Sequence, residues 1–244
     1  MRVKPEARTF VALDTPDIER ARVLARVLAG RVGGFKVGLE AFVAFGPSLI
    51  SELRGLGHAV FLDLKFHDIP NTVAGASAAA ARCGVSLLTV HALGGPAMIA
   101  RAVEASRAAA APGSAPPIVL AVTILTSHDD LSLRHVGIEG TCADAVPRLA
   151  TLAREAGAGG VVCSPLEVAA ARRVFPEGLL VVPGIRPKTT GDRPGDDQAR
   201  VASPAEAVRA GADLIVVGRP ITAASDPVAA AAAIADDIHR NAGN

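Results

Sequence analysis

Two lysines and two aspartates early in the chain have the types and spacing needed for acid–base or electrostatic chemistry. In the string FLDLKF, Asp63 and Lys65 are two residues apart, so on an extended strand both side chains point to the same side. Two other apolar runs carry Asp14 and Lys36 near their ends. If the three runs are neighbouring parallel strands, the four side chains form a row of alternating charge at the carboxyl edge of the sheet.

The scarcity of lysine draws attention to the same residues. Of the 25 basic residues only four are lysines, at positions 4, 36, 65 and 188. An ammonium is a compact charge that can release a proton, whereas a guanidinium stays charged and cannot replace it in that role. Lys36 and Lys65 are therefore candidates for a chemical function rather than for general surface charge.

A structural ion-pair network is the alternative explanation for this row. Burying an ion costs several kcal/mol after relaxation, and buried ion pairs are often no more stabilising than apolar packing. At about 4 Å and an effective dielectric of about 20, each pairing contributes roughly 4 kcal/mol before desolvation, which suffices to keep both lysines charged. We therefore favour a functional role for Asp14, Lys36, Asp63 and Lys65.

A second group of residues is suited to binding phosphate. Gly-Arg-Pro at 218–220 follows the last apolar run of the chain, and Pro-Gly-Ile-Arg at 183–186 follows the run before it. A glycine lets backbone N–H groups approach an anion closely, and an arginine can bind the anion with two hydrogen bonds. Taken alone, Gly-Arg-Pro also fits an ordinary turn between a strand and a helix.

The elements that must position these residues are short apolar runs that alternate with longer alanine- and leucine-rich stretches of helical period. This alternation is typical of parallel strands joined by crossover helices, and 244 residues is close to the usual length of a (β/α)₈ barrel. We therefore predict an α/β fold, a single-domain (β/α)₈ TIM barrel over residues 1–244. The predicted strands are Thr9–Asp14, Gly34–Val37, Ala59–Leu64, Leu87–Val90, Ile118–Thr123, Gly160–Cys163, Leu179–Pro183 and Leu214–Val217.

Two helix starts are marked by a Ser-Pro-x-Glu sequence. Ser164 and Ser203 each precede a proline and stand three residues before a glutamate, Glu167 and Glu206. This is the pattern of a capping box with proline in the first turn. We expect a helix to begin at each serine.

Two connections are longer than a strand-to-helix loop requires, Thr126–Cys142 and Gly184–Val201. Long loops inside one domain are usually lids or binding loops. Both follow a strand, at the face where barrel enzymes have their active sites. The small-residue stretch 108–117 is instead expected to be a surface connection.

Charge and cysteine content argue against several kinds of partner and site. The formal net charge is +1, so no global field attracts nucleic acid or an anionic membrane. The first eight residues are polar and the alanine-rich stretch 229–235 is too short to span a bilayer, so we expect a cytoplasmic protein. Three widely spaced cysteines predict neither a disulfide framework nor a zinc site, and the histidines lack metal-ligand spacing.

The string DLKFHDIPNT at 63–72 resembles the signature of bacterial orotidine 5′-phosphate decarboxylases. Supporting matches cover nearly the whole chain except the linker near Pro112 and the two termini. They are VALD (11–14), FKVG (35–38), TVHA (89–92), TILTS (123–127), PGIR (183–186), DDQARV (196–201) and VGRP (217–220). The resemblance implies a lyase that converts orotidine 5′-phosphate to uridine 5′-phosphate and CO₂, the last step of pyrimidine nucleotide synthesis, without a metal or a cofactor.

The resemblance also implies roles for individual residues. Lys65 would donate the proton that replaces CO₂, within a charged array formed with Lys36, Asp63 and Asp68. The other residues would bind the substrate: Asp14, Lys36 and Thr123 at the ribose, Ser127 at the pyrimidine edge, and Arg186, Gln198, Gly218 and Arg219 at the 5′-phosphate, with Pro183 and Thr72 also in contact. His91 is left outside this set, because a lone histidine at a strand end is as often a packed core residue.

The partners implied by the resemblance are a small-molecule nucleotide and a second copy of the chain. In such a homodimer Asp68 and the segment through Thr72 reach into the neighbouring subunit's active site. One alternative is a metal-dependent sugar-phosphate decarboxylase or epimerase on a related barrel, which shares the Asp-x-Lys-x-x-Asp motif but has an acidic metal ligand where this chain has Lys36. The other is a non-catalytic nucleotide-binding barrel, which has no need of the charged row.

Overall fold

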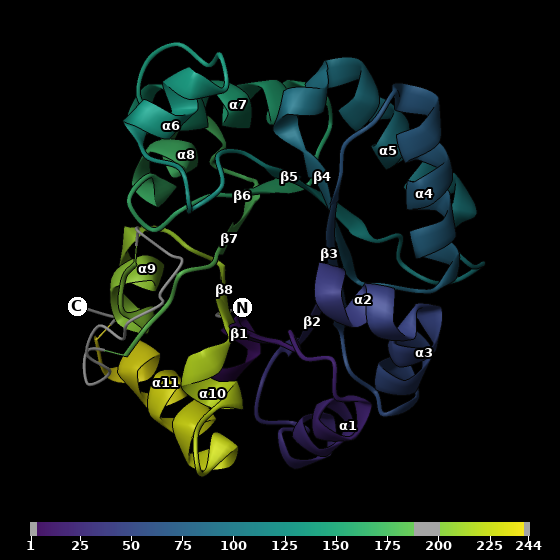
Figure 1. The fold of residues 1–244 in the computed structure, drawn as a ribbon, viewed down its shortest axis with the longest axis vertical. Helices are drawn as coiled ribbons and strands as arrows, with labels where there is room; N and C mark the ends of the chain where they lie inside the picture. Colours follow the sequence, from purple (N-terminus) through teal and green to yellow (C-terminus); the bar gives the residue numbers. More distant parts are fainter. Residues whose placement is uncertain (1–3, 188–200, 242–244) are drawn as a thin grey trace.

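Eight parallel strands form the inner wall of the structure, a computed structural model that describes residues 4–187 and 201–241. They follow one another in chain order, and the pairing of the first strand with the eighth closes the ring (Figure 1). This confirms the predicted α/β barrel, and the strand ends lie within two residues of those predicted. The strands are β1 (Thr9–Ala12), β2 (Gly34–Gly38), β3 (Val60–Phe66), β4 (Leu87–His91), β5 (Ile118–Val122), β6 (Gly160–Val162), β7 (Leu179–Val182) and β8 (Leu214–Val217).

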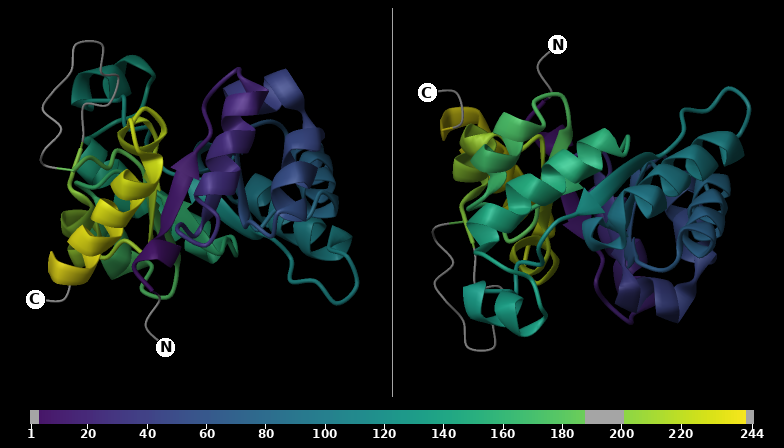
Figure 2. Two further views of the ribbon diagram at one scale, coloured as in Figure 1. Left: turned by 90° about the horizontal axis from the view of Figure 1, so that it is seen from below. Right: turned by 90° about the horizontal axis from the view of Figure 1, so that it is seen from above.

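Helices cover the outside of the barrel on every side (Figures 1 and 2). The two longest, α5 and α11, have 15 residues each, and no helix in the described part of the chain is long and apolar enough to cross a membrane. The α-helices are α1 (Ile18–Val27), α2 (Leu39–Phe45), α3 (Pro47–Gly55), α4 (Pro70–Arg82), α5 (Gly95–Ala109), α6 (Asp130–His135), α7 (Cys142–Glu155), α8 (Val168–Val174), α9 (Pro204–Ala210), α10 (Arg219–Thr222) and α11 (Pro227–Asn241). Two 3₁₀ turns are η1 (Glu6–Arg8) and η2 (Ala92–Gly94).

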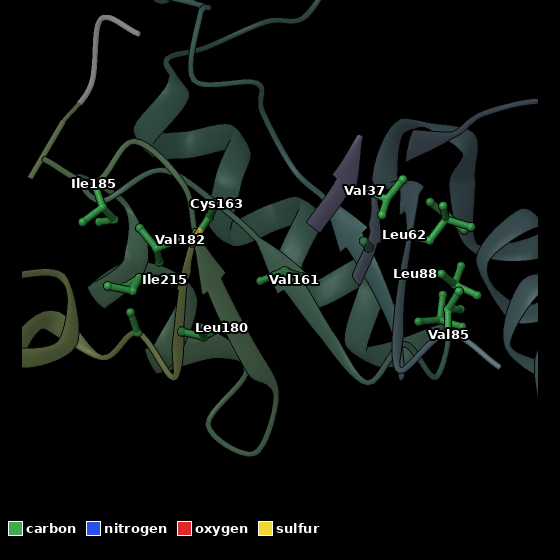
Figure 3. Close-up of a cluster of buried hydrophobic side chains, with 14 of the residues drawn as sticks. Val37, Leu62, Val85, Leu88, Val161, Cys163, Leu180, Val182, Ile185 and Ile215 are labelled. Atoms are coloured by element: carbon green, nitrogen blue, oxygen red, sulfur yellow. The ribbon is translucent and has the colours of Figure 1, made fainter. Parts of the chain in front are cut away.

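Alternation along the strands separates two apolar layers. One set of side chains, which includes Phe10 and Phe61, packs together inside the barrel. The other set, which includes Val37 and Leu62 and is shown in part in Figure 3, packs between the barrel and the helices. Because Phe61 points inward and Leu62 points outward, the period of two directs the following charged positions of β3 into the barrel, as predicted.

One of the two predicted helix starts is confirmed and the other is wrong. Ser203 caps α9, and its hydroxyl and the carboxylate of Glu206 form the reciprocal bonds of a capping box. The helix near Ser164 begins four residues later, at Val168, because residues 164–167 form a turn in which the N–H of Glu167 donates to the carbonyl of Ser164 at 3.2 Å. The Ser164 hydroxyl instead contacts the Glu167 carboxylate.

The two long connections differ in what they contain. The one after β5 forms the short helix α6 before α7 begins, and Asp129 and Thr141 cap these helices with capping boxes that the sequence analysis did not identify. The one after β7 has its ends described, while residues 188–200 lie outside the described residues. The stretch from 110 to 117 joins α5 to β5 and is exposed over most of its length, which confirms a surface connection.

Candidate active site

A cavity of about 650 Å³ opens at the carboxyl ends of the strands. Its apolar floor comes from the inward-facing side chains of Phe61, Val122, Val162 and Val216, each on a different strand. Residues from the strand ends and the following loops make up the rest of the lining, and they include the charged side chains of Asp14, Lys36, Asp63, Lys65, Arg186 and Arg219. The volume is in the range of sites for small-molecule ligands.

The predicted row of alternating charge is present on one wall of this cavity. Lys36 Nζ lies 3.0 Å from Asp14 Oδ1 and 3.7 Å from Asp63 Oδ2. Lys65 Nζ lies 2.9 Å from the same oxygen of Asp63. All four residues line the cavity, and they come from three adjacent strands: β2, β3 and the end of β1.

The two middle residues of the row are more buried than the two residues at its ends. The side chains of Lys36 and Asp63 are 10% and 12% exposed, whereas those of Lys65 and Asp14 are 32% and 50% exposed. Each buried charge has an opposite charge in contact, which offsets the free energy that desolvation costs. The ammonium of Lys65 is paired with Asp63 and is also exposed to the cavity, where a ligand could contact it.

The backbone of β3 is irregular at Lys65. Four residue steps from Leu62 to Phe66 face two steps from Leu88 to Val90 on β4, so β3 carries a bulge. Lys65 has a φ of 50°, and it is the one non-glycine residue with positive φ in the described part of the chain. Such a conformation costs an L-residue roughly 1–2 kcal/mol and persists where surrounding contacts hold it. The local strain therefore falls on the cavity lysine.

The residues predicted to hold a phosphate come together after β7 and β8. Arg186 and Pro183 follow β7, Gly218 precedes α10, and Arg219 is its first residue; all four line the cavity. Gln198, also predicted to hold the phosphate, lies outside the described residues. Two guanidinium groups at one cavity suit an anionic ligand.

The connection after β7 leaves and returns at a single point of the cavity rim. The N–H of Arg186 donates to the carbonyl of Ala202 at 2.9 Å, and the N–H of Ala202 donates to the carbonyl of Gly184 at 3.2 Å. This parallel bridge between Ile185 and Ala202 fixes both ends of the loop. Arg186 is thus held next to the strands and is not carried far along the loop.

Comparison with models of known protein families assigns the chain to a family. The model described as "Orotidine 5'-phosphate decarboxylase / HUMPS family" matches residues 8–234. The chain belongs to this family. The resemblance inferred from the motifs is confirmed at the level of the family.

Individual members of the family match over nearly their whole length. The curated orotidine 5′-phosphate decarboxylase of Anaeromyxobacter sp. (strain K) is 57% identical over 235 residues, which cover 96% of this chain and 99% of the relative. That of Paramagnetospirillum magneticum is 52% identical over 227 residues, 92% of this chain and 95% of the relative. The crystal structure of orotidine 5′-phosphate decarboxylase from Lactobacillus acidophilus has a TM-score of 0.81 at 40% identity, covering 94% of this chain and 98% of that one.

Two residues that the family resemblance assigned to the nucleotide, Thr123 and Ser127, are not among the described residues of the cavity lining. Thr123 is fully buried, and its hydroxyl donates to the carbonyl of Val162 at 2.9 Å. Ser127 is exposed. Their nucleotide contacts stay predictions, and Thr126, which sequence reasoning missed, lines the cavity. β5 ends at Val122 and Thr126 lies in the turn that follows, so the alternation of a strand could not have identified it.

Asp68 and Thr72 are exposed and stand apart from the cavity lining of their own chain as far as it is described. Asp68 accepts a hydrogen bond from the N–H of Ile69 at 2.6 Å. Together with Ile69 and Leu93 it lines a second, open depression of about 520 Å³. The predicted contribution of Asp68 and Thr72 to a partner subunit stays a prediction.

His91 ends β4 beside the bulge and is half-buried. Its ring stacks on that of His67, with centroids 5.3 Å apart and 20° between the planes, and its Nδ1 accepts a hydrogen bond from the N–H of Leu93 at 3.4 Å. Burial, and next the charges of His67 and Lys65, lower the pKa of His91 from 6.5 to about 4. His91 is therefore neutral at pH 7.

Lys36 separates the two carboxylates in the described part of the cavity lining. Within residues 4–187 and 201–241, no group of three or more His, Cys, Asp or Glu side chains is arranged to hold a metal ion. The two cavity carboxylates, Asp14 and Asp63, are bridged by the ammonium of Lys36. The ammonium of Lys36 is therefore the cation that lies between these two carboxylates.

Proposed function

We propose that this protein decarboxylates orotidine 5′-phosphate to uridine 5′-phosphate and CO₂, with Lys65 as the proton donor. The observation that carries the proposal is the continuous row of ion pairs from Asp14 through Lys36 and Asp63 to Lys65. The names of the curated relatives support the substrate. Arg186 and Arg219, which also line the cavity, are proposed to bind its phosphate.

The chemistry of the substrate explains why a fixed ammonium is needed. When the bond from C6 to the carboxylate carbon breaks, its electron pair stays on C6 in the plane of the ring, where the π-system cannot delocalise it. Positive charge held at that carbon is worth more in the transition state than in the ground state, which accelerates the step. Lys65 Nζ then transfers a proton to C6, and the neutral amine regains a proton from water.

Asp63 is proposed to act in two ways. Its Oδ2 is 2.9 Å from Lys65 Nζ and 3.7 Å from Lys36 Nζ, so it keeps both ammonium groups in place. It also carries negative charge next to the departing carboxylate, and the loss of neutral CO₂ relieves this repulsion. A side chain only 12% exposed exerts this field with little screening by solvent.

The remaining substrate groups are assigned to the other lining residues. Asp14 and Lys36 are proposed to bind the ribose, and Thr126 is suited to contact the nucleoside as well because its hydroxyl-bearing side chain lines the cavity. Arg186 and Arg219, with Pro183, Gly218 and Gln198, are proposed to bind the 5′-phosphate. Binding energy from this remote group lowers the barrier when it is used to hold the ring against the charged row.

Independence of a metal ion is part of the proposal. Lys36 Nζ lies 3.0 Å from Asp14 and 3.7 Å from Asp63, between the two carboxylates that a divalent cation would need. Two ammonium groups in one wall repel such a cation. A metal-dependent sugar-phosphate decarboxylase would need an acidic ligand at this strand end.

A homodimer with shared active sites completes the proposal. Asp68 is exposed beside the apolar side chains of Ile69, 68% exposed, and Leu93, 43% exposed. An exposed apolar surface next to a carboxylate that stands apart from the cavity of its own chain suits a subunit interface. We propose that Asp68 and the segment through Thr72 serve the partner's site.

The test compares orotidine 5′-phosphate with a substrate of the alternative, metal-dependent class. Purified protein is assayed with orotidine 5′-phosphate in D₂O, and in parallel with 3-keto-gulonate 6-phosphate and magnesium. We expect equal amounts of CO₂ and uridine 5′-phosphate, with deuterium at C6, and no turnover of the sugar phosphate. Turnover of the sugar phosphate alone would overturn the proposal.

A further inference from the structure

Thr89 lies directly behind Asp63 and Lys65, the two residues of the charged row on β3. It is in the middle of β4, is fully buried, and points into the barrel like its register partner Leu120. It does not line the cavity, and β4 contributes no residue to the part of the lining that the structure describes. Any effect of Thr89 on a ligand must therefore act through its neighbours.

The hydroxyl of Thr89 connects the backbone of one of these neighbours to the side chain of the other. It accepts a hydrogen bond from the N–H of Lys65 at 2.9 Å and donates one to Oδ1 of Asp63 at 3.0 Å. Because a hydroxyl has a single hydrogen, accepting from Lys65 leaves that hydrogen directed at Asp63. Asp63 is thus held through Oδ1 by Thr89 and through Oδ2 by the two lysines.

The same hydroxyl occupies the bulge in β3. Between the pairs Leu62↔Leu88 and Phe66↔Val90 the regular pairing of β3 with β4 is interrupted. The N–H of Lys65 points to the Thr89 hydroxyl instead of a β4 carbonyl. A side chain therefore stabilises the left-handed conformation of Lys65, whose φ is 50°.

We infer that Thr89 is a positioning residue for the reaction, and this inference rests on the proposed role of Lys65. Its branched side chain has few rotamers, and full burial keeps it in one of them. It fixes the carboxylate of Asp63 and the backbone at Lys65 relative to each other, and so sets where the ammonium stands against the ring. The proposed phosphate contacts lie after β7 and β8 and do not depend on it.

The test replaces Thr89 by valine, which has the same shape but no hydroxyl. We expect kcat to fall roughly 10- to 100-fold, while KM and the affinity for uridine 5′-phosphate stay within about threefold. Thr89→Ser keeps the hydroxyl and should recover most of kcat. If Thr89→Val gives little folded protein, Thr89→Cys, whose thiol is a weak donor and acceptor, should lower kcat in the same direction.

A matched control is available on the first strand. Thr9 is also a buried threonine of a barrel strand, 2% exposed, and its hydroxyl has no hydrogen-bond partner among the described residues. It stands at the amino end of the barrel, away from the cavity. Thr9→Val should leave kcat unchanged, which separates loss of a hydroxyl from loss of the contacts to Lys65 and Asp63.

A second readout does not depend on turnover. With ¹³C at Cε, the four lysines give four resonances, which substitution of Lys36 or Lys65 by arginine assigns. Thr89→Val should move the Lys65 resonance, and Thr89→Ser should return it. The inference is overturned by an unmoved Lys65 resonance, by a Thr89→Val kcat within about threefold of wild type, or by equal losses in kcat and affinity. A wild type inactive on orotidine 5′-phosphate overturns the proposed function instead, and the resonance alone then decides on Thr89.

Discussion

Lys36 and Lys65 share the carboxylate of Asp63 but meet solvent differently, with side chains 10% and 32% exposed. The more buried ammonium, that of Lys36, lies between two carboxylates, and we propose that it acts as a fixed charge. The less buried one, that of Lys65, has a single carboxylate neighbour among the described residues, and we propose that it is the proton donor. Exposure therefore distinguishes two residues of the same type.

Replacement of Lys65 tests this division. Lys65→Ala should lower kcat by about a thousandfold or more, because it removes both the charge at C6 and the proton donor. The protein should still fold and bind uridine 5′-phosphate, which calorimetry measures. Lys65→Arg should fail as well, since guanidinium is a poor acid. An arginine variant within about tenfold of wild type would refute the role.

The lowered pKa of His91 predicts a pH-dependent stability. Its pKa is about 4 in the folded protein and 6.5 in the unfolded chain, so between these values the unfolded chain binds the proton. The free energy of unfolding should therefore fall as pH drops from 6.5 to 4. Discounted for partial exposure, the loss is roughly 1–2 kcal/mol. Urea unfolding at pH 7 and pH 4.5 should show a smaller loss for His91→Asn; an equal loss in both proteins would contradict the assignment.

At the scale of the elements, alternation predicted most of the site and failed where the strands are irregular. A period of two correctly directed Asp63 and Lys65 into the barrel, and the turns after β7 and β8 brought Arg186 and Arg219 to the cavity. The bulge at Lys65 was not predicted, because register between strands far apart in sequence depends on tertiary pairing. The bulge determines which groups the Thr89 hydroxyl contacts, so the sequence did not indicate a role for Thr89.

The loops after β7 and β8 are predicted to act on the phosphate alone. Arg219→Ala should lower kcat/KM for orotidine 5′-phosphate, with a smaller loss for orotidine, which lacks the phosphate. The protein change and the substrate change form a double-mutant cycle whose coupling isolates the contact. Losses of equal size with both substrates would mean that Arg219 acts on another group.

At the scale of the whole molecule, one chain brings three residues of the proposed array, Lys36, Asp63 and Lys65, to its own cavity. The fourth, Asp68, lies on the exposed surface, in the depression that it lines with Ile69 and Leu93. Pairing of β2 with both β1 and β3 brings these three strands together, whereas the chain beyond Phe66 turns outward into α4. Assembly was inferred from the family and not from residue patterns, because an interface has no periodic signal in the sequence.

Subunit mixing tests the shared site. Lys65→Ala and Asp68→Ala homodimers, each inactive, are mixed under conditions that exchange subunits. If Asp68 serves the partner, each mixed dimer has one site with both changes and one with neither, so up to about half of the mixed-dimer sites regain activity. If Asp68 serves its own chain, every site keeps one change. No recovery with exchange confirmed would contradict the shared site and leave the decarboxylase proposal intact.

The most direct measurement of the central claim is turnover of orotidine 5′-phosphate by protein freed of metal ions and assayed in a strong chelator. With Lys36 and Lys65 supplying the positive charge, we predict that kcat and KM equal those of untreated protein. Loss of turnover on chelation, restored by magnesium or zinc, would contradict the claim that the row of Asp14, Lys36, Asp63 and Lys65 carries the reaction.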